Sequence, residues 1–83
     1  MTYSIRITRH ARQRMTQRDV SEDEVLGVVN GPPSLVSHDL EVGSYRLERG
    51  LDRGRLKVWV VPPWPPTYAH DVVIVKSVAW KGR

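Results

Sequence analysis

The sequence predicts an α+β domain in which two short N-terminal helices pack on an antiparallel sheet of about four strands. Helical periodicity is confined to residues between about 8 and 30. Between about 34 and 80 the pattern becomes strand-like, with Val, Leu, Tyr and Trp separated by turn-forming residues. A chain of 83 residues can bury one modest core, so we expect a single two-layer domain over residues 1–83.

The first helix is predicted from about Arg9 to Arg18. The preceding residues 3–7, YSIRI, alternate as a strand does, and Thr8 is a favourable residue for capping a helix. Asp19 and Val20 then form the turn that ends this helix.

The second helix is predicted from about Glu22 to Asn30. Ser21, followed three residues later by Glu24, forms a capping box that marks a helix start. Gly31 and the two prolines after it prevent the helix from continuing. The acids of the first turn suit the helix dipole and need no functional role.

Four strand-like segments follow, and together they predict an antiparallel meander. They cover residues 34–38, 44–50, 55–61 and 71–80. Residues 62–68, PPWPPTY, are expected to form a stiff polyproline-like loop. That loop is either a rigid connection in which Trp64 covers an edge of the sheet, or a binding tip.

Composition excludes several classes of protein. No apolar run approaches the roughly 20 residues that span a bilayer, so we expect no membrane partner. The start of the chain has no apolar signal-peptide region, which predicts a cytoplasmic protein, although a module cut from a longer toxin would carry no signal either. The absence of cysteine excludes disulfides, thiolate chemistry and cysteine-ligated zinc.

The positive charge is concentrated and is mostly arginine. The net charge is +4, and ten of the thirteen cationic residues are arginines. Residues 1–18 hold five arginines and no acid, whereas residues 19–24 hold four acids. Because arginine can bind a phosphate through two parallel hydrogen bonds, this pattern favours a nucleic-acid partner, although high genomic GC content also enriches arginine.

A stripe of three side chains on the first helix is the strongest candidate site. At 100° per residue Ala11 and Met15 face the sheet, and His10, Arg14 and Arg18 follow the edge of that buried face. Such side chains reach the margin of the sheet. The alternative is that the arginine stems pack along the helix edge and the histidine is an ordinary satisfied polar residue.

Residues 7–25, ITRHARQRMTQRDVSEDEV, resemble the start of a small bacterial domain family of unknown function. Its members begin with a His-Ala-x-x-Arg-Met-x-x-Arg helix and a Ser-x-x-Glu-capped second helix, and end in a strand similar to VVIVKSVAW at 72–80. Asp19 stands where the family commonly has glycine, and aspartate tolerates the left-handed turn conformation. That family is similar to BrnT and RelE-type toxins, in the fold group of barnase-like, colicin-like and RelE-like ribonucleases. The resemblance therefore implies one RelE-like domain.

Metal-free RNA cleavage needs a base for the 2′-hydroxyl, cations for the phosphorane charge and an acid for the leaving oxygen. His10 is the natural base, because neighbouring arginines disfavour its imidazolium form. Arg14 and Lys57 are the other catalytic candidates. The candidates for binding nucleic acid are Arg6, Arg18, Arg46 and Trp59.

Three aromatic or hydroxyl assignments have structural alternatives. Trp59, which shares one face of its strand with Lys57, is either a stacking surface or a core residue. Tyr45 is either an acid or a core residue. Ser77 either binds phosphate or fills its strand.

We expect no metal ion and no cofactor. His70 and Asp71 alternate across a strand start and cannot ligate from one side, and His38 has no partner at a suitable spacing.

Two functions are compatible with these features. The first is a toxin-type, metal-independent endoribonuclease that arrests growth and is covered by an acidic antitoxin. The second is a non-catalytic module of the same fold that binds nucleic acid or an acidic protein with the same arginines.

Overall fold

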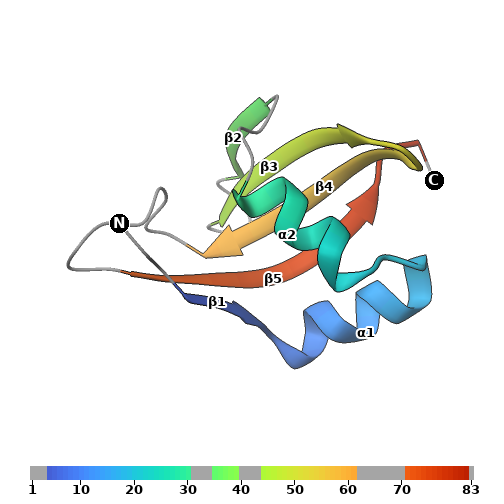
Figure 1. Ribbon diagram of the computed structural model, residues 1–83. Coiled ribbons are helices and arrows are strands. Elements are labelled where there is room, and N and C mark those ends of the chain that lie inside the picture. Colours follow the sequence, from blue (N-terminus) through green and yellow to red (C-terminus); the bar gives the residue numbers. More distant parts are fainter. Residues whose placement is uncertain (1–3, 31–34, 40–43, 62–70, 83) are drawn as a thin grey trace.

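The computed structural model describes residues 4–30, 35–39, 44–61 and 71–82 (Figure 1). The described part is an α+β arrangement of two helices and five strands. The helices are α1 (Arg9–Arg18) and α2 (Glu22–Asn30), and the strands are β1 (Ser4–Ile7), β2 (Leu35–Asp39), β3 (Ser44–Leu51), β4 (Gly54–Val61) and β5 (Val72–Trp80). The α+β class and the bounds of both helices agree with the predictions. Residues 62–70, including Trp64 and His70, lie outside the described residues.

The sheet differs from the predicted one in strand number and in direction. Its order is β1-β5-β4-β3-β2, and the four strands β2 to β5 are antiparallel neighbours. β1 pairs in parallel with β5, from Ser4 opposite Val72 to Ile7 opposite Val75. The sheet is therefore mixed and has five strands. Alternation in YSIRI indicated a strand but not its partner, which lies at the other end of the sequence.

The ends of α1 are fixed by the two residues expected there. Thr8 Oγ1 accepts a hydrogen bond from the backbone N–H of Ala11 at 3.1 Å. At the other end Asp19 adopts the left-handed conformation, with φ of 53°, and the N–H of Val20 donates to the carbonyl of Met15 at 2.8 Å. Aspartate is one of the few non-glycine residues that enter this conformation routinely, so the helix ends here.

The start of α2 is the predicted capping box. The N–H of Ser21 donates to Oε1 of Glu24 at 3.0 Å, and the N–H of Glu24 donates to Oγ of Ser21 at 3.1 Å. Two N–H groups that the first helical turn leaves unpaired are thereby satisfied.

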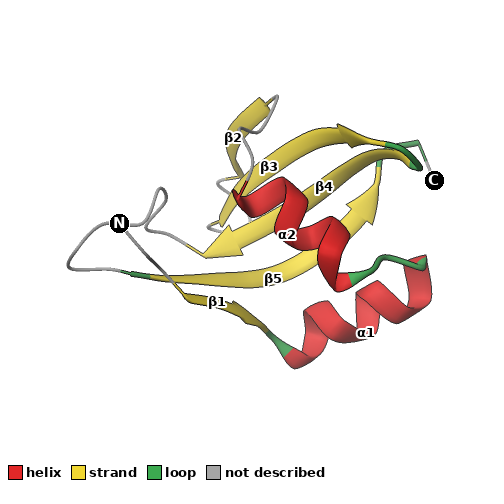
Figure 2. Ribbon diagram, viewed as in Figure 1, coloured by secondary structure: helices red, strands yellow, loops and turns green. Residues whose placement is uncertain are grey.

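The core lies between the helices and one face of the sheet. α2 crosses β3 and β4, and α1 runs beside β5 (Figure 2). The core is made of apolar side chains from both layers. They are Ala11, Met15, Val20, Val25, Val28, Val29, Leu47, Leu56, Val58, Val60, Val73, Val75, Val78 and Trp80. Neither helix in the described ranges is long and apolar enough to cross a membrane.

The opposite side of the sheet, here called the second face, carries polar and aromatic side chains. On β4 the buried residues Leu56, Val58 and Val60 alternate with Lys57 and Trp59, which therefore point to the second face. Trp59 is half-buried and does not belong to the core cluster.

A β-bulge between β4 and β5 changes which side chains of β5 reach the second face. Trp59 lies opposite Ser77, and Val60 lies opposite Val75, so Lys76 is the extra residue. After such a bulge the alternation resumes in the opposite phase. Val75 and Val78 are accordingly both buried in the core, although they are three residues apart.

Candidate functional site

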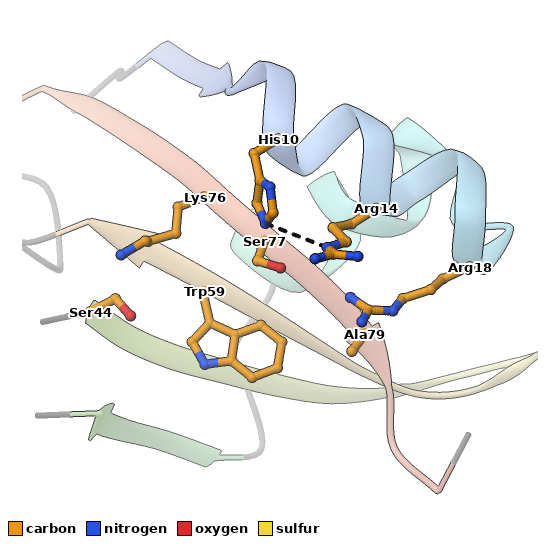
Figure 3. Close-up of a pocket in the computed structure, with 8 residues that line it drawn as sticks. All are labelled: His10, Arg14, Arg18, Ser44, Trp59, Lys76, Ser77 and Ala79. Carbon is orange, nitrogen blue, oxygen red and sulfur yellow. Dashed lines mark hydrogen bonds between the residues drawn. The ribbon is translucent and has the colours of Figure 1, made fainter. Parts of the chain in front are cut away.

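A cavity of about 370 Å³ lies where α1 meets the second face of the sheet (Figure 3). Its walls come from α1 and from three strands, β3, β4 and β5. The lining residues are His10, Arg14, Arg18, Ser44, Trp59, Lys76, Ser77 and Ala79. The structure thus brings together four of the seven site residues expected from the sequence: His10, Arg14, Arg18 and Trp59.

His10 and Arg14 contact each other across one turn of α1. Arg14 Nε donates to His10 Nε2 at 3.4 Å, and Arg14 Nη1 donates to Oε1 of Gln17 at 2.9 Å. Because a guanidinium can only donate, Nε2 of His10 is the acceptor in this contact. His10 is exposed and Arg14 is half-buried. The site therefore holds an imidazole nitrogen that accepts from a neighbouring cation.

Arg18 lines the cavity and also fastens α1 to β5. Its Nη1 donates to the carbonyl of Val78 at 2.6 Å, and Trp80 Nε1 donates to the carbonyl of Arg18 at 2.7 Å. One nitrogen of this guanidinium therefore has a structural partner. This agrees with the structural alternative for the stripe, in which the arginines pack along the edge of the helix.

The floor of the cavity is the cross-strand pair Trp59 and Ser77. Lys57 lies beside this floor but does not line the cavity. Its Nζ is 5.6 Å from the centroid of the Trp59 ring, which is a cation–π distance. The lysine that does line the cavity is Lys76.

Sequence reasoning missed Lys76 and Ser44. In VVIVKSVAW the buried side chains are at positions 73 and 75 and then at 78 and 80, so the alternation shifts by one residue after Val75. Such a shift indicates a bulge, and this bulge is what places Lys76 at the cavity. Ser44 is fully buried, and its hydroxyl has no hydrogen-bond partner in the part of the chain that the structure describes. A serine at a strand start gives no sequence signal for this role.

Arg46 lies outside the cavity, although it faces Trp59 across β3 and β4. Its Nε is 3.1 Å from Oε2 of Glu48, an ion-pair distance. Glu48 is 3% exposed and also accepts a hydrogen bond from Arg55 Nε at 3.0 Å. Two arginines on the second face therefore share one buried carboxylate.

Two further candidates also lie elsewhere. Arg6 is exposed on β1 and lines a separate hollow together with Arg12. Tyr45 is half-buried opposite Val60 and packs against the core, so it is on the side of the sheet away from the cavity.

The candidate metal ligands do not form a cluster in the described ranges. No group of three or more histidine, aspartate or glutamate side chains is found there. The side chain of His38 lies outside the described part, and Asp71 is exposed, with its carbonyl accepting the N–H of Ser4 at 2.8 Å.

The electrostatic character of the cavity is one-sided. Arg14, Arg18 and Lys76 are cationic, and no carboxylate is among its described lining residues. An indole, two serine hydroxyls and an imidazole complete the wall. This combination suits a ligand that carries phosphate and a flat ring.

No protein-family model, curated protein or solved structure matched the chain.

Proposed function

We propose that the protein is a toxin-type, metal-independent endoribonuclease. The observation that supports this proposal is the cavity between α1 and the second face, where one imidazole acceptor and three cations surround a space floored by an indole. The resemblance of residues 7–25 to a family similar to RelE-type toxins points to the same chemistry.

The reaction begins at His10. Its Nε2 takes the proton of a ribose 2′-hydroxyl as the 2′-oxygen bonds to phosphorus, and Arg14 and Arg18 balance the charge on the phosphorane. The bond from phosphorus to the 5′-oxygen then breaks, and the leaving oxygen takes a proton from a water molecule. The products are a 2′,3′-cyclic phosphate and a 5′-hydroxyl. The imidazolium gives its proton to the hydroxide that the water leaves behind.

Arg14 has two uses in this scheme. In the free protein it donates to the lone pair of His10 that must accept the proton, over a long contact of 3.4 Å. When a phosphate draws the guanidinium away, that lone pair becomes available. Substrate binding and activation of the base are therefore coupled.

A second candidate function is supported by the exposure of His10. Water weakens the electrostatic interactions around an exposed base, so such a base is a poorer catalyst than one in a closed site. In this alternative the same cavity binds nucleic acid, or an acidic protein, without cleaving anything. An acidic antitoxin is the protein partner that would cover the cavity in either case, because it would pair with the same cations.

The deciding experiment is incubation of the purified protein with a single-stranded oligoribonucleotide in excess chelator, with the product ends mapped. We expect 2′,3′-cyclic ends, and a rate about 10²–10⁴-fold lower for His10→Ala. Gln13→Ala is the matched control, because Gln13 is an exposed α1 residue that does not line the cavity. Absence of cleavage by well-folded wild type would leave the binding module as the function. Loss of activity in chelator, restored by a divalent ion, would contradict metal independence.

A further inference from the structure

The cavity has two chemically distinct ends, which the sheet register separates along the strands. Tyr45 lies opposite Val60, so Ser44 falls one residue further along, beside the end of β4. Lys76, the extra residue at the bulge, lies between Val75 and Ser77 and approaches the same end from β5. Figure 3 shows the side chains of Ser44 and Lys76 on the same side of the cavity. This end therefore offers an ammonium and a hydroxyl.

The opposite end is formed by Arg14 and Arg18. Arg18 is held there by the carbonyl of Val78, further along β5 than the bulge. In Figure 3 these two guanidinium groups lie across the cavity from Lys76. The second end therefore offers two planar groups that suit a phosphate.

Trp59 and Ser77 lie between the two ends. The span from Lys76 to Ala79 along β5 is about 10 Å at the usual strand rise. The matching span from His10 to Arg18 on α1 is about 12 Å at the usual helix rise. The cavity is thus elongated along the strands, with a flat aromatic side chain in its middle.

Ser44 independently points to a ligand at its end of the cavity. Its side chain is fully buried, yet its hydroxyl has no hydrogen-bond partner among the described residues. Buried polar groups are almost always paired, because leaving one unpaired is costly. A ligand oxygen that enters from the cavity would supply the missing partner.

We propose that this cavity contains two phosphate subsites on either side of one base-binding position. Ser44 and Lys76 form the first subsite, Arg14 and Arg18 form the second, and the base between them stacks on Trp59. The ligand is then an internal nucleotide of single-stranded RNA, with a phosphate on each side, and not a terminal phosphate. This inference rests on the proposed function for its choice of RNA.

The test compares adenosine 3′,5′-bisphosphate with adenosine 5′-diphosphate by calorimetric titration of the full chain. Both ligands carry one adenine and two phosphates, but only the bisphosphate places a phosphate on each side of the nucleoside. We expect the bisphosphate to bind at least about tenfold more tightly, a difference of about 1.4 kcal/mol. Adenosine 3′-monophosphate and adenosine 5′-monophosphate give the affinity expected when one subsite is filled.

Variants assign the subsites. Lys76→Gln and Arg14→Gln should each lower the affinity for the bisphosphate to about that of a monophosphate. Arg9→Gln is the matched control, because it removes the same charge from an exposed α1 position that does not line the cavity. Melting curves monitored by circular dichroism establish that each variant is folded.

Equal affinity for the bisphosphate and the diphosphate would overturn the two-subsite proposal, as would an equal loss with Arg9→Gln. Cleavage of RNA that depends on His10, without preference for the bisphosphate, would overturn the subsites alone. Preference for the bisphosphate without RNA cleavage would support the subsites and reject the ribonuclease.

Discussion

Arg14 Nε lies 3.4 Å from His10 Nε2, so the base and the phosphate-binding cation of the proposed reaction are in contact before any substrate arrives. The two side chains come from positions four apart, which places them on the same face of α1. Their roles nevertheless differ, because one holds charge and the other moves a proton.

Substitution of these two residues should separate binding from chemistry. His10→Ala should lower single-turnover cleavage by about 10²–10⁴-fold and leave RNA affinity nearly unchanged. Arg14→Ala should weaken both, because it holds phosphate in the ground state and in the transition state. Filter binding and rapid-quench cleavage on the same preparations measure the two effects. A fall in melting temperature for His10→Ala, with affinity and cleavage lost in parallel, would identify the histidine as structural.

The two lysines of the second face should contribute unequally to cleavage. Lys76 lines the cavity, whereas Lys57 lies beside Trp59 outside it. Lys76→Gln should therefore lower the cleavage rate at subsaturating RNA by about tenfold, because the phosphate next to the cleaved one is bound more weakly. Lys57→Gln should lower the cleavage rate much less, because it removes only the cation–π contact that helps to hold the Trp59 ring. If Lys57→Gln lowered the cleavage rate more than Lys76→Gln does, Lys57 would be the catalytic lysine, as expected from the sequence.

RNA affinity should fall steeply as salt rises, because each phosphate contact releases counterions. For single strands the slope of log affinity against log salt is about −0.7 for each phosphate neutralised. Arg14→Ala, which removes one phosphate contact, should reduce the magnitude of this slope by about 0.7. Arg9→Ala, which removes an exposed cation outside the cavity, should change it much less. An affinity that is indifferent to salt would reject both nucleic-acid functions.

Ser44→Ala should have opposite effects on the free and the bound protein. Because the buried hydroxyl has no partner among the described residues, removing it should raise the free energy of unfolding by about 1 kcal/mol. The same substitution should weaken RNA binding, since the ligand loses a hydrogen bond. Thermal melting with and without a non-cleavable 2′-O-methyl oligonucleotide measures both effects. Destabilisation of the free protein would show that the hydroxyl already has a partner.

Arg53 should contribute to stability but not to RNA binding. Its Nη2 is 2.7 Å from Oδ2 of Asp19, its Nη1 is 3.3 Å from Oε1 of Glu24, and its guanidinium lies 5.4 Å from the centroid of the Trp80 ring. The side chain is 44% exposed, so solvent screens these interactions, and Arg53→Ala should lower the free energy of unfolding by about 0.5–1 kcal/mol. Asp52→Ala in the same turn is the control in denaturant titrations. An accompanying loss of RNA affinity would place the binding surface elsewhere.

The helices were predictable because their ends are encoded locally. The capping contacts of Thr8, Asp19 and the Ser21–Glu24 pair all join residues that are three or four positions apart. A short stretch of sequence therefore contains everything needed to predict them. The stripe of His10, Arg14 and Arg18 was predictable for the same reason, because helical geometry alone brings it together.

The remaining features depend on contacts between distant residues. The parallel pairing of β1 with β5 joins Ser4 to Val72, and nothing in either segment specifies its partner. The bulge that brings Lys76 into the cavity depends on how β5 aligns with β4. For Arg18, the hydrogen bond to the carbonyl of Val78 links residues 60 positions apart, so its structural role was not visible in the sequence.

The attachment of α1 to β5 at both of its ends makes the cavity preorganised. The N–H of Thr8 donates to the carbonyl of Val75 at 3.1 Å, and Arg18 and Val78 are joined at the other end. The helix therefore cannot swing away from the sheet without breaking hydrogen bonds at one end or the other. Local unfolding of α1 must therefore break its attachments to β5 as well as its own helical hydrogen bonds. Because the helical wall of the site is already ordered, little binding free energy is lost to ordering it when a ligand binds.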